Sequence, residues 1–216
     1  MKEIRFRPIG VIHTPFTHIA GMPIQPSGAT GIRGTIRLDS RWVAGLKDLA
    51  GFSHIILVYH FHLSEGFRLR VKPFMDDHLR GVFATRAPRR PNPIGISVVK
   101  LLGVKGRTLQ VENVDMVDAT PLLDIKPYVP KFDAVQAPRT GWLSGKAQKA
   151  AGVKADARFG PERGTSRNPA GRREQKKNIT PKGESLWLKE KSPASNRPKA
   201  RWEKRTKPLY RALRAY

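Results

Sequence analysis

Short apolar runs separated by turn signals fill residues 1–145 and limit the folds open to this chain. Each run is too short for a long helix but has the length of a strand. The clearest pair, Ile96–Val104 and Thr108–Val114, flanks Lys105-Gly106-Arg107 and predicts a β-hairpin. Many short strands with one or two short helices indicate a mainly β fold, either a small antiparallel barrel or a sandwich.

The remaining elements follow from the same pattern. Ser53–Tyr59 is a continuous apolar run, which suits a strand buried on both faces. Ser40 can cap a short helix through Leu49, because Val43, Leu46 and Leu49 recur at three-residue intervals. Further strands are expected at residues 4–12, 31–38, 69–73, 81–84 and 122–125.

The net charge of +24 is unevenly spread and divides the chain near residue 145. Residues 1–145 carry 20 Lys and Arg against 11 Asp and Glu, whereas residues 146–216 carry 21 against 6. We therefore expect a β domain over residues 1–145 and a basic C-terminal extension over residues 146–216. Residues 146–183 hold only isolated apolar side chains, so we expect this part of the extension to be disordered.

A strongly basic extension favours nucleic acid as the partner, because its field attracts polyanions. Trp202 is surrounded by basic residues that include Arg205 and Arg211. Aromatic rings among cations can stack on bases while the charges follow the phosphates, so we predict RNA contacts here. The alternatives are a tail kept basic for solubility and an amphipathic helix that docks on the domain.

Several classes of site are excluded or disfavoured. The chain has no cysteine, which excludes disulfides, thiolate metal sites and cysteine nucleophiles. His54, His60 and His62 share one parity on the expected strand, but no carboxylate accompanies them at a ligand-like spacing. We therefore predict no metal, and a pocket or core role for these histidines. Walker A, Rossmann and nucleophile-elbow patterns are absent from the sequence.

Neither a membrane-spanning run nor a secretory signal is found. No apolar run approaches the roughly 20 residues that cross a bilayer. The first residues lack the apolar core of a signal peptide. We expect a cytoplasmic location without membrane association.

The segment Ala84–Gly95 combines three arginines with three prolines. Proline restricts its own φ and biases the preceding residue toward extended backbone, so a stiff loop is predicted. A stiff loop holds Arg86, Arg89 and Arg90 with less entropy to lose on binding, and guanidinium groups suit a carboxylate or phosphate. The alternative is a surface turn whose arginines are only solvated.

A second polar segment runs from Asp115 to Tyr128. Asp118 begins a turn, and Asp118 and Thr120 are suited to hydrogen bonds with a ribose or an amine. Asp124 and Lys126 have the same parity on a strand and can pair. The alternative is a turn with a surface ion pair, which contributes little to stability.

These segments resemble the TsaA/TrmO family over roughly residues 5–140. The resemblance lies in separate motifs that follow the family's order: Pro8–Ile12, Gly51–Ile55, Gly81–Arg86, Arg90–Gly95, Asp118–Pro121 and Asp124–Tyr128. It implies a small β-barrel, a homodimer, and S-adenosyl-L-methionine bound near the subunit interface. It also implies transfer of a methyl group to N6 of threonylcarbamoyladenosine beside the anticodon of tRNA.

The resemblance also implies which residues contact the cofactor: Pro23, Gln25, His62, Leu63, Arg86, Ile96, Asp118, Ala119, Thr120 and Pro121. Two positions depart from the family pattern. Ile24 stands where the family has arginine, and Ala119 stands where it has glycine. Alanine restricts the backbone conformations that glycine allows.

Roles are expected for further residues. Arg86 would hold the carboxylate of the cofactor or of the threonyl group, and Asp118, His62 or Tyr128 would accept the proton. Contacts with RNA are expected from Arg89, Arg90, Lys126, Trp202, Arg205 and Arg211. Two other functions remain open: a non-catalytic RNA-binding barrel, and a methyltransferase with another acceptor.

Overall fold

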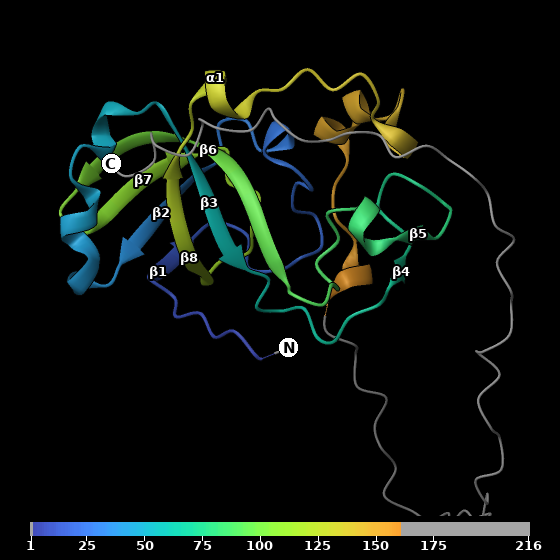
Figure 1. Cartoon of the computed structure of the whole chain (residues 1–216), viewed down its shortest axis with the longest axis horizontal. Helices are drawn as coiled ribbons and strands as arrows, with labels where there is room; N and C mark the ends of the chain where they lie inside the picture. The colour runs from blue at the N-terminus through green and yellow to red at the C-terminus, as the bar shows by residue number, and fades with distance from the viewer. Residues whose placement is uncertain (1, 161–216) are drawn as a thin grey trace, which may run out of the picture. The chain divides into compact units, whose positions relative to one another are not determined.

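Six antiparallel strands close into a barrel (Figure 1). The computed structural model describes residues 2–160. The strand order around the barrel is β1-β2-β7-β6-β3-β8, and β8 pairs with β1 to close it. The strands are β1 (Gly10–His13), β2 (Arg33–Leu38), β3 (His54–His60), β6 (Ile94–Lys105), β7 (Thr108–Glu112) and β8 (Thr120–Pro127). The expected β-barrel is confirmed.

Alternating side chains from the six strands fill the barrel interior. In β3, Ile55 and Leu57 are completely buried and Tyr59 is 4% exposed, whereas Ile56 and Val58 are half-buried. The expectation that this strand is buried on both faces was therefore wrong. A single closed sheet has one interior face, and successive side chains of a strand alternate between its two faces.

The predicted hairpin is confirmed as β6 and β7, which are joined by Gly106 and Arg107. Gly106 has a φ of 57°, a left-handed conformation that glycine adopts without steric cost. β6 begins at Ile94, two residues earlier than predicted, where Ile94 pairs with His60 of β3.

Other boundaries differ from the sequence-based expectations. The first strand begins at Gly10 rather than at residue 4, since Pro8 has no N–H to donate and Ile4 and Phe6 are exposed. The helix expected from Ser40 is a 3₁₀ helix, Ser40–Leu46, capped by Asp39. Its three-residue apolar spacing matches the 3.0 residues per turn of a 3₁₀ helix.

The remaining elements are short. Residues 69–73 and 81–84 were expected as strands, but only β4 (Arg70–Val71) and β5 (Arg80–Gly81) pair. The one α-helix in residues 2–160 is α1 (Pro130–Asp133). Further 3₁₀ turns are Pro26–Gly28, Leu49–Gly51, Val82–Ala84, Gly141–Leu143, Ala147–Gly152 and Ala157–Phe159. None of the helices in this described part is long and apolar enough to span a membrane.

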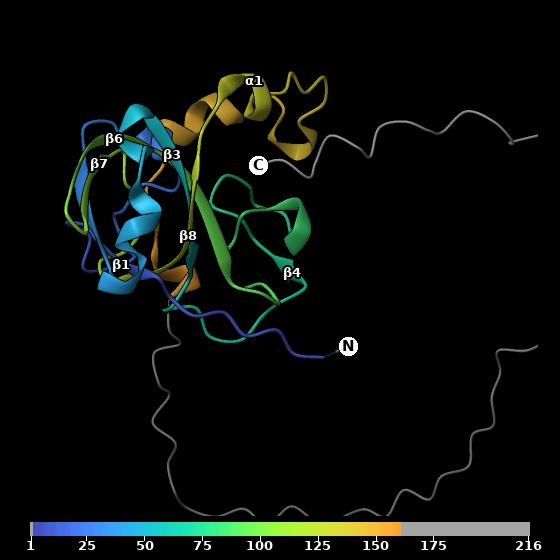
Figure 2. The same cartoon turned by 60° about the vertical axis from the view of Figure 1, so that its left-hand side comes forward.

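A second layer, residues 61–93 and 146–160, packs beside the barrel (Figure 1 and Figure 2). Its apolar cluster includes Val71, Val82 and Phe159, and the ring of Phe159 meets that of Phe74 edge to face at 5.1 Å between centroids. Ala155 exchanges backbone hydrogen bonds with Gly21 and Met22. This layer therefore joins two segments that are far apart in the chain.

Residues 146–160 thus differ from the expectation of disorder. Ala155 and Phe159 are buried, and this burial offsets part of the cost of ordering a basic segment. The domain boundary at residue 145 stays a prediction. The extension beyond residue 160, including Trp202, Arg205 and Arg211, lies outside the described residues.

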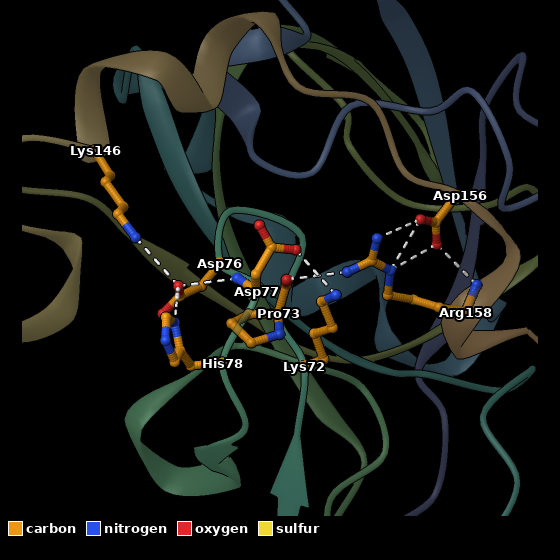
Figure 3. A network of polar contacts seen from close by, with 8 residues as sticks. All are labelled: Lys72, Pro73, Asp76, Asp77, His78, Lys146, Asp156 and Arg158. Atoms are coloured by element: carbon orange, nitrogen blue, oxygen red, sulfur yellow. Dashed lines mark hydrogen bonds and ion pairs between the residues drawn. The ribbon is translucent and has the colours of Figure 1, made fainter.

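A carboxylate buried between the two segments of the layer connects them (Figure 3). The Asp76 side chain is 3% exposed and accepts hydrogen bonds from Arg80, His78 and Lys146. Burial alone would raise the pKa of Asp76, but these hydrogen bonds outweigh it and hold the pKa well below 3.8. Lys146 comes from the second segment, so Asp76 ties residues 76–80 to residues 146–160.

We expect Asp76→Asn to lower the melting temperature clearly near neutral pH, since it leaves two cationic partners, Arg80 and Lys146, around an uncharged side chain. The ionised carboxylate stabilises the fold above about pH 4, and this contribution is lost as the pH falls through the lowered pKa. The difference between wild type and variant should therefore shrink on acidification. Thermal denaturation between pH 3 and pH 8 measures both effects.

The matched control for this prediction is Asp77→Asn. The Asp77 side chain is 93% exposed and pairs only with the half-exposed Lys72 among residues 2–160. An exposed ion pair contributes little, so this variant should melt close to wild type. Equal melting temperatures for the two variants would contradict the role assigned to Asp76.

Candidate active site

A cavity of about 550 Å³ lies at one end of the barrel, where β3 ends and β6 and β8 begin. The barrel contributes Tyr59, Ile96 and Thr120 to its wall, and the layer contributes Phe74 and Phe159. Cavities of this size and mixed lining are typical of sites that hold a small molecule. Seven of the ten expected cofactor contacts line it: Pro23, Gln25, His62, Leu63, Arg86, Ile96 and Thr120.

The proline-rich loop places Arg86 in the cavity wall. Thr85 orders this loop: its hydroxyl donates to the Val82 carbonyl at 2.8 Å and accepts from the Ala87 N–H at 3.2 Å. Arg86 Nη1 donates to Gln25 Oε1 at 2.9 Å, which joins this loop to residues 19–25. The arrangement holds a guanidinium ready for a carboxylate or phosphate.

The neighbouring arginines have different surroundings. Arg90 lines the cavity, and its Nη1 donates to the Thr85 carbonyl at 3.2 Å. Arg89 is only 8% exposed, and its Nη2 donates to the Gly160 carbonyl at 2.8 Å. Arg89 therefore fits a structural role better than the expected direct contact with an RNA phosphate. Sequence could not distinguish the structural role from the RNA contact, because Arg89 bonds to Gly160, which lies 71 residues away in the chain.

His62 is the expected proton acceptor that lines the cavity. Burial lowers its pKa, and the neighbouring His60 adds to this effect, so His62 is neutral near pH 7. Its Nδ1 lies 3.5 Å from the Thr120 hydroxyl, which donates to the Val117 carbonyl at 2.6 Å. A neutral imidazole in this position can accept a hydrogen bond from a bound molecule.

Asp118 is not among the residues that line the cavity. Its Oδ1 accepts a hydrogen bond from the Thr14 N–H at 3.1 Å and lies 3.2 Å from His13 Nδ1. The hydrogen bond from Thr14 lowers the pKa of Asp118, which makes it a weaker base. This environment argues against Asp118 as the proton acceptor and assigns it to the turn that precedes β8.

Ala119 occupies the left-handed region in that turn, with a φ of 59°. Alanine pays a steric cost in this conformation that glycine avoids. Neither Ala119 nor Pro121 lines the cavity, although the Thr120 between them does. Ala119 therefore holds its left-handed conformation at the expense of backbone strain.

Tyr128 and Lys126 lie toward the other end of β8. Tyr128 is eight residues beyond Thr120, which along a strand is about 25 Å. It packs edge to face on His54, with 6.3 Å between the ring centroids. Lys126 Nζ pairs with Asp124 at 2.6 Å, which confirms their predicted pairing. The expected catalytic role of Tyr128 does not fit this position.

Sequence reasoning missed Asp115, a cavity residue from the segment between β7 and β8. The Ser97 hydroxyl of β6 donates to Asp115 Oδ1 at 2.7 Å, and the Tyr59 hydroxyl lies 3.1 Å from Ser97 Oγ. The available signal was an acidic residue between Val114 and Met116, both of which are buried.

Gly95 allows Tyr59 to reach this position. A Cβ atom at Gly95 would lie 2.3 Å from Cε2 of the Tyr59 ring, closer than real contacts permit. The ring packs against the backbone of β6, directly across the strand pair. Within residues 2–160, no group of three or more His, Asp or Glu is arranged to hold a metal ion.

Comparisons with known proteins point to one family. The family model described as the tRNA-methyltransferase O N-terminal domain matches residues 11–134. A probable S-adenosyl-L-methionine-binding protein of Pyrococcus abyssi is 52% identical over 72% of this chain and 85% of its own length. The human tRNA (adenine(37)-N6)-methyltransferase is 35% identical over 60% of this chain and 31% of its own length.

A solved structure agrees with these sequence matches. The crystal structure of TrmO from Pseudomonas aeruginosa superposes with a TM-score of 0.56 and 39% identity, covering 65% of this chain and 63% of that one. This chain thus spans less than two thirds of the solved protein and about a third of the human one.

We expect Ala119→Gly to stabilise the protein by about 1 kcal/mol, since it removes the steric cost of the left-handed conformation. For a chain of this size that is a rise of about 3 °C in melting temperature. Ala134→Gly is the matched control. Ala134 has a φ of −92°, so glycine relieves no strain there and only raises the conformational entropy of the unfolded chain, which lowers stability. A fall in melting temperature for both variants would refute the strain at Ala119.

Proposed function

The chain belongs to the tRNA-methyltransferase O N-terminal domain family, and on this premise we propose that it methylates tRNA. The proposed reaction transfers a methyl group from S-adenosyl-L-methionine to N6 of threonylcarbamoyladenosine next to the anticodon. The observation that carries the proposal is the cavity at the barrel end, which gathers Arg86, Gln25 and His62 within apolar and aromatic walls.

The residues of the cavity fit S-adenosyl-L-methionine, which supplies a methyl group activated by its sulfonium. The guanidinium of Arg86 suits the carboxylate of the cofactor's amino-acid part or that of the threonyl group. Phe74, Phe159 and Ile96 offer apolar surface for the adenine and the aliphatic chain. Ile24 also lines the cavity, so one wall is apolar where the family has a cation.

The main task of these residues is to position and shield the reacting groups. Arg86 is oriented by Gln25, and His62 is neutral and next to Thr120. Apolar walls exclude water from the reacting groups. Holding donor and acceptor in line removes much of the entropic barrier to transfer from an activated methyl donor.

A basic hollow supports tRNA as the partner. It measures about 330 Å³ and is lined by five cationic side chains and no acidic ones: Arg68, Arg70, Lys72, Arg89 and Arg158. Phe159 lines both this hollow and the cavity, so the hollow adjoins the candidate active site. Arg89 contributes positive charge to this hollow although its side chain is largely buried. Phosphates of the anticodon arm are the proposed occupants.

A homodimer in the cytoplasm completes the proposal. Phe83 and Ile96 line the cavity and are 76% and 55% exposed. Large exposed apolar side chains beside a binding site support a protein partner there, and a second copy would cover them.

The proposed function predicts a mass gain of one methyl group on threonylcarbamoyladenosine when tRNA is incubated with the protein and S-adenosyl-L-methionine. Nucleoside mass spectrometry measures this gain. Arg86→Ala should reduce it at least about 100-fold, because the variant loses the carboxylate ligand. Arg37→Ala, on the outer face of β2, is the matched control and should retain activity.

The negative outcomes separate the alternatives. Cofactor binding without methylation of this nucleoside would indicate another acceptor. Absence of both methylation and saturable cofactor binding, with tRNA binding retained, would indicate a non-catalytic RNA-binding barrel.

The basic extension is predicted to contribute to tRNA affinity. The triple variant Trp202→Ala, Arg205→Ala and Arg211→Ala should bind tRNA more weakly, and its slope of log affinity against log salt should fall by about 2. The double variant Arg33→Ala and Arg37→Ala removes the same charge from β2 and should bind like wild type. Binding titrations from 50 to 300 mM salt test both variants. An unchanged slope in the triple variant would show that Trp202, Arg205 and Arg211 do not contact the tRNA.

A further inference from the structure

Asp115 is the only carboxylate that lines the cavity within residues 2–160. We propose that Asp115 accepts the proton that the target nitrogen loses during methyl transfer. This inference rests on the proposed function and adds a catalytic residue to the same site. Of the three acceptors expected from sequence, Tyr128 and Asp118 lie outside the cavity lining, and His62 lines it together with Asp115.

A hydrogen-bonded chain holds Asp115 in place. The single hydroxyl proton of Ser97 is donated to Asp115, so the Tyr59 hydroxyl is the donor to Ser97 Oγ. Ser97 and Tyr59 are 3% and 4% exposed, and both lie at the end of the barrel that carries the cavity. The carboxylate therefore stands at the cavity wall with its orientation set from inside the barrel.

The surroundings make Asp115 a stronger base than an ordinary aspartate. Burial raises the pKa of Asp115 to about 6, against the opposing effects of the Ser97 hydrogen bond and the positive charge of Arg86. The other ionisable groups around it are Tyr59 from β3, His62 after β3, and Arg90 from the loop before β6. Such a group is ionised near pH 7 and still binds a proton well, as a general base requires.

The proposed step is balanced. The target nitrogen, which is conjugated to a carbonyl, forms a bond to the methyl carbon. Sulfur keeps the electron pair of the bond that breaks, and the proton of the nitrogen moves to a carboxylate oxygen of Asp115. No oxidant, metal or further reactant takes part.

Asp115→Asn tests the role directly. We expect single-turnover methylation to fall by about 100-fold or more, the usual contribution of a general base, while the dissociation constant for S-adenosyl-L-methionine measured by calorimetry stays within about threefold. Asp124→Asn on the exposed side of β8 is the control for the same chemical change and should remain active. Retained activity in Asp115→Asn, or a loss of cofactor binding as large as the loss of activity, would overturn the proposal.

Ser97→Ala tests the mechanism through a shift of the pH–rate profile rather than through a loss of activity. This variant removes a hydrogen bond that favours the ionised carboxylate, so the acidic limb of the pH–rate profile should move to higher pH by about half a unit or more. The titration of the Asp115 carboxyl, followed by ¹³C NMR without substrate, should move in the same direction. A purely structural role for Ser97 would lower the rate at every pH and leave this limb unchanged.

A second variant and the wild type complete the design. Tyr59→Phe breaks the chain one link earlier and should give a smaller shift in the same direction, which covers the case that Ser97→Ala does not fold. Wild-type activity on threonylcarbamoyladenosine decides the proposed function. The ratio of the methylation rates of variant and wild type, together with the carboxyl titration, decides the role of Asp115. Failure of the proposed function is therefore distinguishable from failure of the role proposed for Asp115.

Discussion

The contact between the Tyr59 ring and the backbone of Gly95 sets the geometry of the barrel end, because strand pairing places them directly opposite each other. With no side chain at Gly95, the ring closes the interior and directs its hydroxyl to Ser97. Ser97 in turn orients Asp115 at the cavity wall. Packing inside the barrel and the position of Asp115 therefore both depend on Tyr59 and Gly95. Tyr59 belongs to the hydrophobic core and also lines the cavity.

The other half of the cavity comes from segments outside the barrel, where the sheet consists of the short β4–β5 pair. Residues 61–93 and 146–160 are held by a small apolar cluster around Phe159 and by polar side chains that enter from both segments, with Asp76 and Arg89 buried among them. Buried charges of this kind stabilise an arrangement only when every partner is present. The cavity thus combines a rigid wall from the barrel with a wall whose position depends on a few polar contacts.

Sequence patterns predicted a mainly β fold and the β6–β7 hairpin, since both depend on local spacing, while the choice of a barrel and the placing of Arg86 at the cofactor site came from the family resemblance. They did not predict the burial of Arg89, the order of residues 146–160 or the role of Asp115. Each of these depends on contacts between distant segments, such as Arg89 with Gly160 and Ser97 with Asp115. Asp118 stood out in sequence because it begins a turn, whereas Asp115 gains its properties from burial, which no local pattern reveals.

Closure of the barrel also governs the order in which the chain can fold during synthesis. β1 pairs on one side with β2 but on the other only with β8, more than 100 residues later. The open edge of β1 stays unpaired until β8 has left the ribosome, and the cavity is incomplete until Phe159 follows. A nascent chain of this protein therefore carries an exposed strand edge until β8 has been made, and its candidate site is completed only after the strands of the barrel are present.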